Sequence, residues 1–282
     1  MNVAVLNQNN NATESVVTPP KMDKILLWYD SSQHKEVSSG NITKLYDRSG
    51  HGFTMAQATT ANQPANTALS GKLGGRRVTY FDSYEDRFGS GDNSFLTGTV
   101  SLLECFGAVL SLNDDPSYTI AWVNSSVSAN ADTNVFLIEA TGATAEIELN
   151  EDGAGVKDGV SLWVTSDSAA AIKDECGGNF IEAGVPRVNV LTCEHSPGSS
   201  IHEIRSNGVA RVWDDLGGSD TTAVTNLGTF SDLNVLTLGV NDDGGSYEGF
   251  SYLAEWIFFN AKLTAAEITQ LESYLNDKWQ VY

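Results

Sequence analysis

Short apolar runs separated by turn-forming residues dominate this chain. From Ile25 onward, runs rich in Val, Ile, Leu, Trp, Tyr and Phe alternate with clusters of Gly, Asn, Asp and Ser. Runs of this length and composition are typical of β-strands, and their close spacing favours an all-β sandwich. The predicted strands cover residues 25–29, 76–81, 117–124, 134–140, 145–149, 160–165, 187–195, 201–206, 209–213, 235–240 and 251–259.

The pair Asn207-Gly208 is the strongest turn signal in the chain. It separates two of the predicted strands, 201–206 and 209–213, by two residues. Both residue types tolerate a positive φ, which a type I′ turn requires at each central position. We therefore expect these two strands to form a hairpin.

One helix is marked near the C-terminus. Thr264 and Glu267 have the spacing of a capping box, in which each side chain accepts a hydrogen bond from the other residue's backbone amide. Leu263 and Ile268 occupy the flanking hydrophobic positions. Four apolar residues share one face of this helix: Ile268, Leu271, Leu275 and Trp279. We expect that face to pack on the sandwich.

The first twenty residues differ from the rest of the chain. They are rich in Asn, Thr and Val, lack apolar periodicity and end at Pro19-Pro20. We therefore predict an extended arm over residues 1–20, able to reach roughly 70 Å at about 3.6 Å per residue, and one sandwich domain over residues 21–282. We expect the arm to contact its own domain or a neighbouring chain. Its candidate binding residues are Asn2, Val3, Val5, Leu6, Val16, Val17, Pro19 and Pro20.

The charge of the chain restricts its partners. The 36 acidic and 16 basic side chains give a net charge of −20, and fifteen acids but only two bases lie between Phe88 and Pro186. A nucleic-acid partner needs clustered Lys and Arg, and an anionic membrane would repel such a surface. No apolar run is long enough to span a bilayer. We therefore expect neither nucleic-acid binding nor membrane insertion.

The cysteines and the N-terminus bear on where the chain is made. No Lys or Arg and no long apolar segment occur before Lys21, so we expect no Sec-type signal peptide. Cys105, Cys176 and Cys193 lack CxxC spacing. We expect buried thiols, with a Cys176–Cys193 disulfide as the alternative. Synthesis in a cytoplasm, without standard export, is the resulting expectation.

Motifs at both ends of the domain carry a family resemblance. LLWYDSS (26–32) and LYDRSGHGF (45–53), with its Asp-x-Ser-Gly-x-Gly pattern, stand near the start, and YFDSYEDRF (80–88) follows. Residues 249–279 contain Leu-Thr-x-x-Glu and end in Tyr-Leu-x-x-Lys-Trp. Together these segments resemble the concanavalin A-like lectin/glucanase superfamily in its laminin G-like branch, although Asp82-Ser83 replaces the Asp-Gly frequent in that family.

The resemblance implies a jelly-roll of two antiparallel sheets. To this the residue patterns add the N-terminal arm and the C-terminal helix. The resemblance also implies that Trp28 and Trp279 pack together. It does not fix an activity, because this fold occurs in lectins, glycosidases, adhesins and virion proteins. The activity has to come from the residues of a site.

Glu146, Glu148 and Glu151 are the sharpest catalytic candidates. Retaining glycosidases of the resembled fold carry Glu-x-Asp-x-x-Glu on a strand, with the outer acids as nucleophile and acid/base. Strand alternation would place Glu146 and Glu148 on one face, but Glu151 falls in the turn NEDGAG and a Glu replaces the middle Asp. The histidines show no metal-ligand spacing and no nucleophile elbow. We expect a solvated strand face and no enzyme.

Acidic turns are the candidate metal sites. Asn241-Asp-Asp-Gly, Asn113-Asp-Asp-Pro and Asn150-Glu-Asp-Gly could offer oxygen ligands to Ca²⁺, whereas such sequences also form turns without any metal. Asp242 and Asp243 are the leading ligand candidates. No cofactor is required by any motif.

A glycan site needs an exposed aromatic platform beside polar groups. Trp122, Trp163 and Trp256 stand in the middle of predicted strands, so we expect them in the core. Trp213, followed by Asp214, and Tyr247, between glycines, are better placed for exposure. These three residues are the candidate glycan contacts.

These observations favour a non-catalytic structural and adhesion protein. The leading hypothesis is a bacteriophage virion surface component (a capsid decoration protein, head fibre or tail-associated adhesin), made in the host cytoplasm. Its arm would bind a major capsid or tail protein, its copies would form a homo-oligomer, and its sandwich would meet host glycans. The alternatives are a bacterial carbohydrate-binding module or adhesin at the cell surface and, third, a glycoside hydrolase of the same fold.

Overall fold

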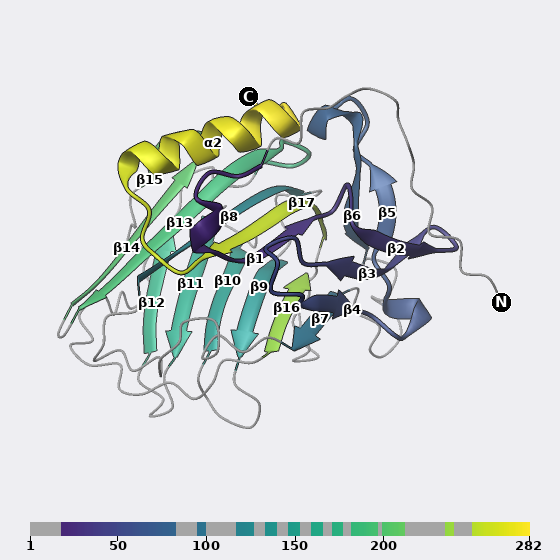
Figure 1. Ribbon diagram of the computed structural model, residues 1–282, viewed down its shortest axis with the longest axis horizontal. Coiled ribbons are helices and arrows are strands. Elements are labelled where there is room, and N and C mark those ends of the chain that lie inside the picture. The colour runs from purple at the N-terminus through teal and green to yellow at the C-terminus, as the bar shows by residue number, and fades with distance from the viewer. Residues whose placement is uncertain are drawn as a thin grey trace.

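The computed structural model describes the greater part of the chain (Figure 1). The described residues are 18–82, 95–99, 117–126, 133–139, 146–152, 159–165, 171–176, 182–196, 199–211, 235–239 and 250–282. They contain seventeen β-strands and one α-helix. All strand pairs are antiparallel, as the sequence predicts for a sandwich, and none of the helices in these ranges is long and apolar enough to cross a membrane.

The strands form two layers. The front sheet is centred on β17, which pairs with β8 along one side and with β6 and then β1 along the other. Beyond β8 follow β13, β14 and β15. Its strands are β1 (Ile25–Asp30), β6 (Arg77–Asp82), β8 (Ser117–Ser126), β13 (Arg187–Ser196), β14 (Ser199–Ser206), β15 (Val209–Arg211) and β17 (Phe250–Phe259).

The back sheet runs in the order β12, β11, β10, β9, β16, β7, β4, β3, β2. Strand β5 (Ala65–Ala68) pairs with β6 and, at one position, with β3, so it joins the two layers. The back-sheet strands are β2 (Lys35–Ser38), β3 (Asn41–Tyr46), β4 (Thr54–Ala56), β7 (Phe95–Thr99), β9 (Thr133–Glu139), β10 (Glu146–Asp152), β11 (Gly159–Thr165), β12 (Ala171–Cys176) and β16 (Val235–Gly239).

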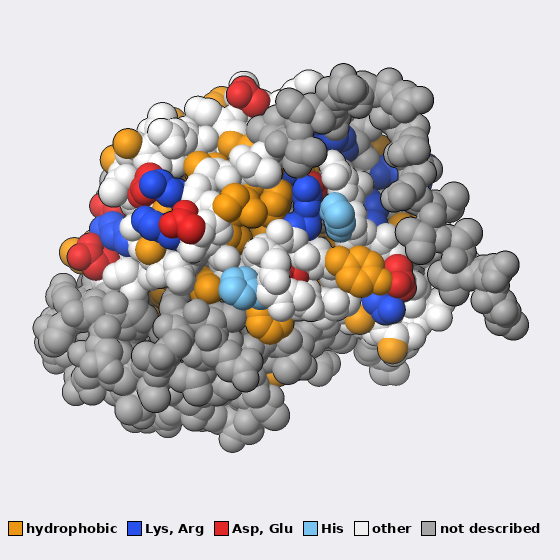
Figure 2. Space-filling model, in the orientation of Figure 1, with side chains coloured by type: hydrophobic (Ala, Val, Ile, Leu, Met, Phe, Trp, Pro, Cys, Tyr) orange, Lys and Arg blue, Asp and Glu red, His pale blue; other side chains and the backbone are white. Residues whose placement is uncertain are grey.

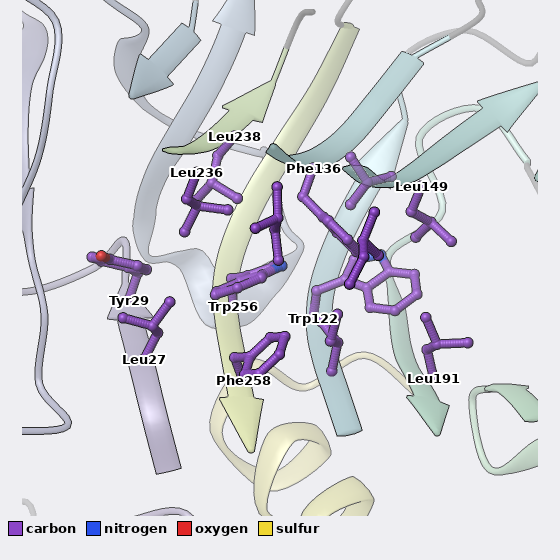
Figure 3. Packing of buried hydrophobic residues seen from close by; sticks show 14 of the residues in the cluster. Leu27, Tyr29, Trp122, Phe136, Leu149, Leu191, Leu236, Leu238, Trp256 and Phe258 are labelled. Atoms are coloured by element: carbon purple, nitrogen blue, oxygen red, sulfur yellow. The ribbon is translucent and has the colours of Figure 1, made fainter. Parts of the chain in front are cut away.

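Large apolar side chains fill the space between the sheets (Figure 3). Trp122 of β8 and Trp256 of β17 are cross-strand neighbours, and both are completely buried. Phe136 of β9 packs edge-on against them, with ring centroids 6.4 and 5.8 Å away. The prediction that these two tryptophans belong to the core is confirmed; Trp163 lies in β11, and its side chain is outside the description.

A second apolar layer lies on the outer face of the front sheet, where α2 (Ala265–Trp279) covers it (Figure 1). The capping box predicted from Thr264 and Glu267 is present in both directions. The predicted apolar stripe of the helix is buried against Val188 and Val190 of β13 and neighbouring residues. The helix is therefore part of the fold's second core.

The predicted strands are all present, with small changes in their ends. Asn207 and Gly208 have φ of 49° and 77°, so the predicted hairpin turn is confirmed. Strand β10 continues to Asp152, which corrects the placement of Glu151 in a turn: the backbone of Glu151 pairs with Val160 and Thr133 on either side. Cys193 is buried, as the sequence predicts, whereas the side chain of Cys176 lies outside the description.

Candidate functional site

A buried charge cluster is the densest polar arrangement in the described part of the chain. Glu255 of β17 is completely buried in the front sheet. Four groups donate to its carboxylate: the indoles of Trp28 and Trp279, each at 2.6 Å, the hydroxyl of Tyr274 at 2.8 Å and the ammonium of Lys278 at 2.9 Å. The expected association of Trp28 with Trp279 is thus made through a shared carboxylate.

Asp30, at the end of β1, is the second acid of this cluster. Its Oδ2 lies 2.8 Å from the Lys278 ammonium and 2.6 Å from Nη1 of Arg48. The Arg48 guanidinium also lies 4.1 Å above the Trp28 ring. Two carboxylates therefore face two cations, and the buried charges balance. Removing one of them would leave its partner uncompensated in a medium of low polarity.

The two acids respond differently to this environment. Burial alone would raise the pKa of Asp30, but the charge of Lys278, with Ser32 and Arg48, outweighs burial and holds the pKa of this carboxyl below its usual value. Burial raises the pKa of Glu255 despite the opposing effect of Lys278. Burial and the nearby Glu255 likewise raise the pKa of the Tyr274 hydroxyl.

The geometry of the buried charge cluster suits a structural role. The side chains of Asp30 and Glu255 have no solvent-exposed surface, and that of Lys278 is only 8% exposed. A general acid or base must touch its substrate, which these carboxylates cannot reach. What the cluster does join is the first strand, the last strand, the final helix and the loop that carries Arg48.

That loop, residues 47–53, is organised around Asp47. One carboxylate oxygen accepts from the amides of Trp28 and Ser49, both at 2.9 Å, and the other accepts from the amide of Gly52 at 3.1 Å. Gly50 and Gly52 have φ of 100° and 81°, which side chains disfavour. The Asp-x-Ser-Gly-x-Gly pattern therefore encodes a loop that fixes Arg48 over the Trp28 ring.

The acids proposed as a catalytic strand do not form a site. Glu146 and Glu148 are half-buried and alternate with the fully or nearly buried Ile147 and Leu149. They therefore share the face of β10 that points away from the core, as strand alternation predicts. In the register of β10 and β11, Trp163 stands opposite Glu148, and Glu151 has the opposite strand parity to Glu146 and Glu148.

Most of the other predicted site residues lie outside the described residues. These are Asn2, Val3, Val5, Leu6, Val16 and Val17 of the arm, the glycan candidates Trp213, Asp214 and Tyr247, and the metal candidates Asp242 and Asp243. Within the described ranges no group of three or more His, Cys, Asp or Glu side chains could hold a metal ion.

The base of the arm is described and lies on the domain. Pro19 is buried and Pro20 is half-buried. Just beyond them, the ammonium groups of Lys21 and Lys24 lie 3.1 and 3.5 Å from Glu267, in the first turn of α2. The point where the predicted arm meets the sandwich is therefore fixed beside the N-terminus of the helix. The division at residue 20 stays a prediction.

An aromatic pair that the sequence did not single out lies on the outer face of the front sheet. Tyr80 of β6 and Tyr252 of β17 are cross-strand neighbours, and both are half-buried. Their rings are stacked, with centroids 4.4 Å apart and planes 18° from parallel. In the sequence each tyrosine is an ordinary strand residue. The stacked pair becomes visible only when β6 and β17, which are distant in sequence, are paired.

Comparisons with known proteins identify the fold. No protein-family model matches the sequence, and no curated protein matches it. Among solved structures, the binding domain of Paraclostridial Mosquitocidal Protein 1 has a TM-score of 0.57 at 11% identity, covering 90% of this chain and 52% of that one. A botulinum neurotoxin type C structure, whose description reports cell entry through two ganglioside molecules, has a TM-score of 0.59 at 11% identity, with the same coverage.

A third match is the ligand-binding domain of botulinum neurotoxin serotype D in complex with N-acetylneuraminic acid. Its TM-score is 0.53 at 8% identity, covering 89% of this chain and 51% of that one. This chain thus spans about half the length of the structures it matches. At such low identity the likeness establishes a shared β-rich fold.

Proposed function

We propose that this protein is a non-catalytic glycan-recognition and adhesion protein. The observation that carries the proposal is the shared fold: about nine-tenths of this chain is covered by matches to botulinum neurotoxin structures, one described with ganglioside molecules and one a ligand-binding domain in complex with N-acetylneuraminic acid. The stacked, half-buried tyrosines provide a partly accessible aromatic surface on which a sugar ring could pack. The buried charge cluster supports the non-catalytic part, because its carboxylates are committed to holding the fold.

The test is glycan binding by the full chain. We expect selective retention on an array of immobilised glycans and a raised unfolding temperature with the retained glycan, because a ligand that binds only the folded state stabilises it. Absence of binding across neutral, sialylated and sulfated glycans would contradict the proposal. Turnover of any array glycan would instead favour the hydrolase alternative.

We further propose that the domain is displayed on an assembly, with a bacteriophage virion surface as the leading case and a bacterial cell surface as the alternative. The fixed base of the arm supports this view, because Pro19 and the Lys21–Glu267 ion pair would let residues 1–18 leave the domain from one defined point. The net charge of −20 suits a surface kept soluble at high local concentration.

Deletion of residues 1–17 tests the display proposal, since it spares every described contact. We expect the truncated domain to keep the unfolding temperature of the full chain and its glycan binding but to lose co-sedimentation with virion particles. Equal incorporation of truncated and full-length protein would contradict a role for the arm.

A further inference from the structure

The region around the stacked tyrosines holds a cation whose described contacts include no carboxylate. Lys72, which precedes the short 3-10 turn Leu73–Gly75, is half-buried, and its ammonium donates to the backbone carbonyl of Gly184. Lys44 beside Glu36 and Lys278 beside Asp30 are paired with acids, whereas Lys35, like Lys72, donates to carbonyl oxygens. Lys72 therefore keeps a charge available for an anionic group.

The backbone brings this cation to the tyrosine pair. The amide of Gly184 donates to the carbonyl of Ser126 at 2.6 Å, so Gly184 is tied to the end of β8. In the same strand, Ser125 lies directly opposite Tyr252 of β17. Lys72 is therefore connected through Gly184 to the end of β8, where Ser125 lies opposite Tyr252, the partner of Tyr80.

Ser125 adds an unsatisfied polar group. Its side chain shares the outer face of the sheet with Tyr252, its residue is only 1% exposed, and its Oγ has no hydrogen-bond partner. A buried hydroxyl without a partner is costly and calls for an explanation. A water molecule that bridges Ser125 to a ligand hydroxyl would satisfy it.

Binding of an anionic ligand is compatible with the net charge of −20, because the charges are unevenly distributed along the chain. Residues 18–82, which include Lys72 and Tyr80, contain eight bases and five acids, whereas residues 88–186 contain fifteen acids and two bases and residues 187–282 contain thirteen acids and five bases. Figure 2 shows basic side chains on the part of the surface where β5 and β6 lie in Figure 1. An anionic ligand would therefore meet a locally basic region.

From these observations we infer that Lys72, Tyr80, Tyr252 and Ser125 form a subsite for a sugar that carries an anionic group, either a carboxylate or a sulfate. The apolar face of the pyranose ring packs on the tyrosines, the anionic group pairs with the Lys72 ammonium, and a ring hydroxyl is linked to the buried Ser125 through a bridging water. The inference rests on the proposed glycan recognition and adds to it the charge class of the sugar and the residues that select it.

Three matched probes test the subsite with the full chain: 3′-sialyllactose, 3′-sulfolactose and lactose. We expect an anionic probe to bind at least about tenfold more tightly than lactose, as one charge-assisted hydrogen bond allows, and its affinity to fall as salt is added. The comparison of the two anionic probes identifies the carboxylate or the sulfate as the group bound.

Variants separate the subsite from general effects. Lys72→Gln should lose about tenfold in affinity for the anionic probe and leave lactose binding unchanged, whereas Tyr252→Leu should weaken both and Ser125→Ala should weaken both by a smaller factor. Lys44→Gln is the control, because its ammonium already pairs with Glu36 at 3.2 Å. Unfolding temperatures establish that each variant is folded.

Two results would overturn the inference and are distinct from failure of the proposed function. If the wild-type chain binds lactose as tightly as both anionic probes, or if Lys72→Gln binds like Lys44→Gln, the subsite is wrong although glycan recognition stands. If the wild-type chain binds no glycan at all, the proposed function itself fails, and the subsite with it.

Discussion

Asp30 and Lys278 are separated by 248 positions in the chain, and the Oδ2 of the first lies 2.8 Å from the Nζ of the second. The ion pair joins the first strand of the front sheet to the helix that ends the fold. Because Lys278 also contacts Glu255, one ammonium bridges two buried acids. This side chain therefore adds a direct link between the beginning and the end of the domain to the pairing of β1 with β17.

Replacing Lys278 with Met should destabilise the domain strongly. The change leaves Glu255 without its cationic partner and Asp30 with Arg48 as its remaining ion-pair partner, and loss of one partner from a buried ion pair costs about 3–5 kcal/mol. The free energy of unfolding in urea measures the effect. Lys262→Met is the control, because its ion pair with Glu194 lies at the surface and should contribute less than about 1 kcal/mol. Equal losses in the two variants would contradict the role of the buried charge cluster.

Replacing Thr264 with Ala should lower stability by about 0.5–2 kcal/mol, because the first turn of α2 loses the acceptor for the Glu267 amide. Thermal unfolding measures the change. Thr269→Ala, within the same helix and also exposed, is the matched control: alanine is the better helix former there, so stability should be unchanged or slightly higher. A larger loss at position 269 than at 264 would contradict the cap.

The other half of the capping box predicts a pH dependence. Hydrogen bonds from the Thr264 backbone and the nearby Lys21 lower the pKa of Glu267 from 4.5 to about 2. As the pH falls, Glu267 is therefore protonated at a higher pH in the unfolded chain than in the folded one. Its contribution to the free energy of unfolding is complete above about pH 4.5 and falls as the pH drops toward 2. The stability difference between wild type and Glu267→Gln should shrink over that interval. A difference that stays constant from pH 6 to pH 3 would contradict the assignment.

Two glycines with nearly the same φ allow the cost of backbone strain to be compared with the cost of a steric clash. Gly239 in β16 and Gly50 have φ of 99° and 100°. A Cβ on Gly239 would lie 2.5 Å from the Phe81 ring, whereas nothing lies within 4 Å of one on Gly50. Gly50→Ala should cost about 1–2 kcal/mol for the backbone alone, and Gly239→Ala about 1–3 kcal/mol more. Urea unfolding of both variants measures the two losses of stability. A larger loss in Gly50→Ala than in Gly239→Ala would contradict the prediction.

Much of the fold could be predicted from local patterns. The runs around Trp122 and Trp256, the Asn207-Gly208 turn and the Thr264–Glu267 box each depend on residues close together in sequence, and all are present in the structure. Strands β2, β3, β4, β5, β7 and β12 were missed. Strands β2 and β5, for example, consist only of half-buried and exposed residues. Such strands lack the continuous apolar run by which a strand is predicted. Their place in the sheet comes from pairing with neighbours.

In the candidate sites, too, some features could be predicted from local sequence and others depend on how the strands pair. The Asp-x-Ser-Gly-x-Gly loop and the final Lys-Trp pair stood out in the sequence, but their meaning, a cation held over Trp28 and an ammonium between Asp30 and Glu255, required the strands to be assembled. No feature of the sequence indicated that Tyr80 and Tyr252 stack on each other. Their rings meet only because β6 and β17, far apart in the chain, are hydrogen-bonded neighbours.

The sequence by itself determined the class of fold, the closing helix and the kinds of partner that a charge of −20 disfavours, because period, capping and net charge are properties of short segments or of their sum. Only the tertiary structure decided which charges are buried and paired and which cation remains available beside an aromatic surface. Those outcomes depend on distances between residues tens to hundreds of positions apart, which no local pattern specifies.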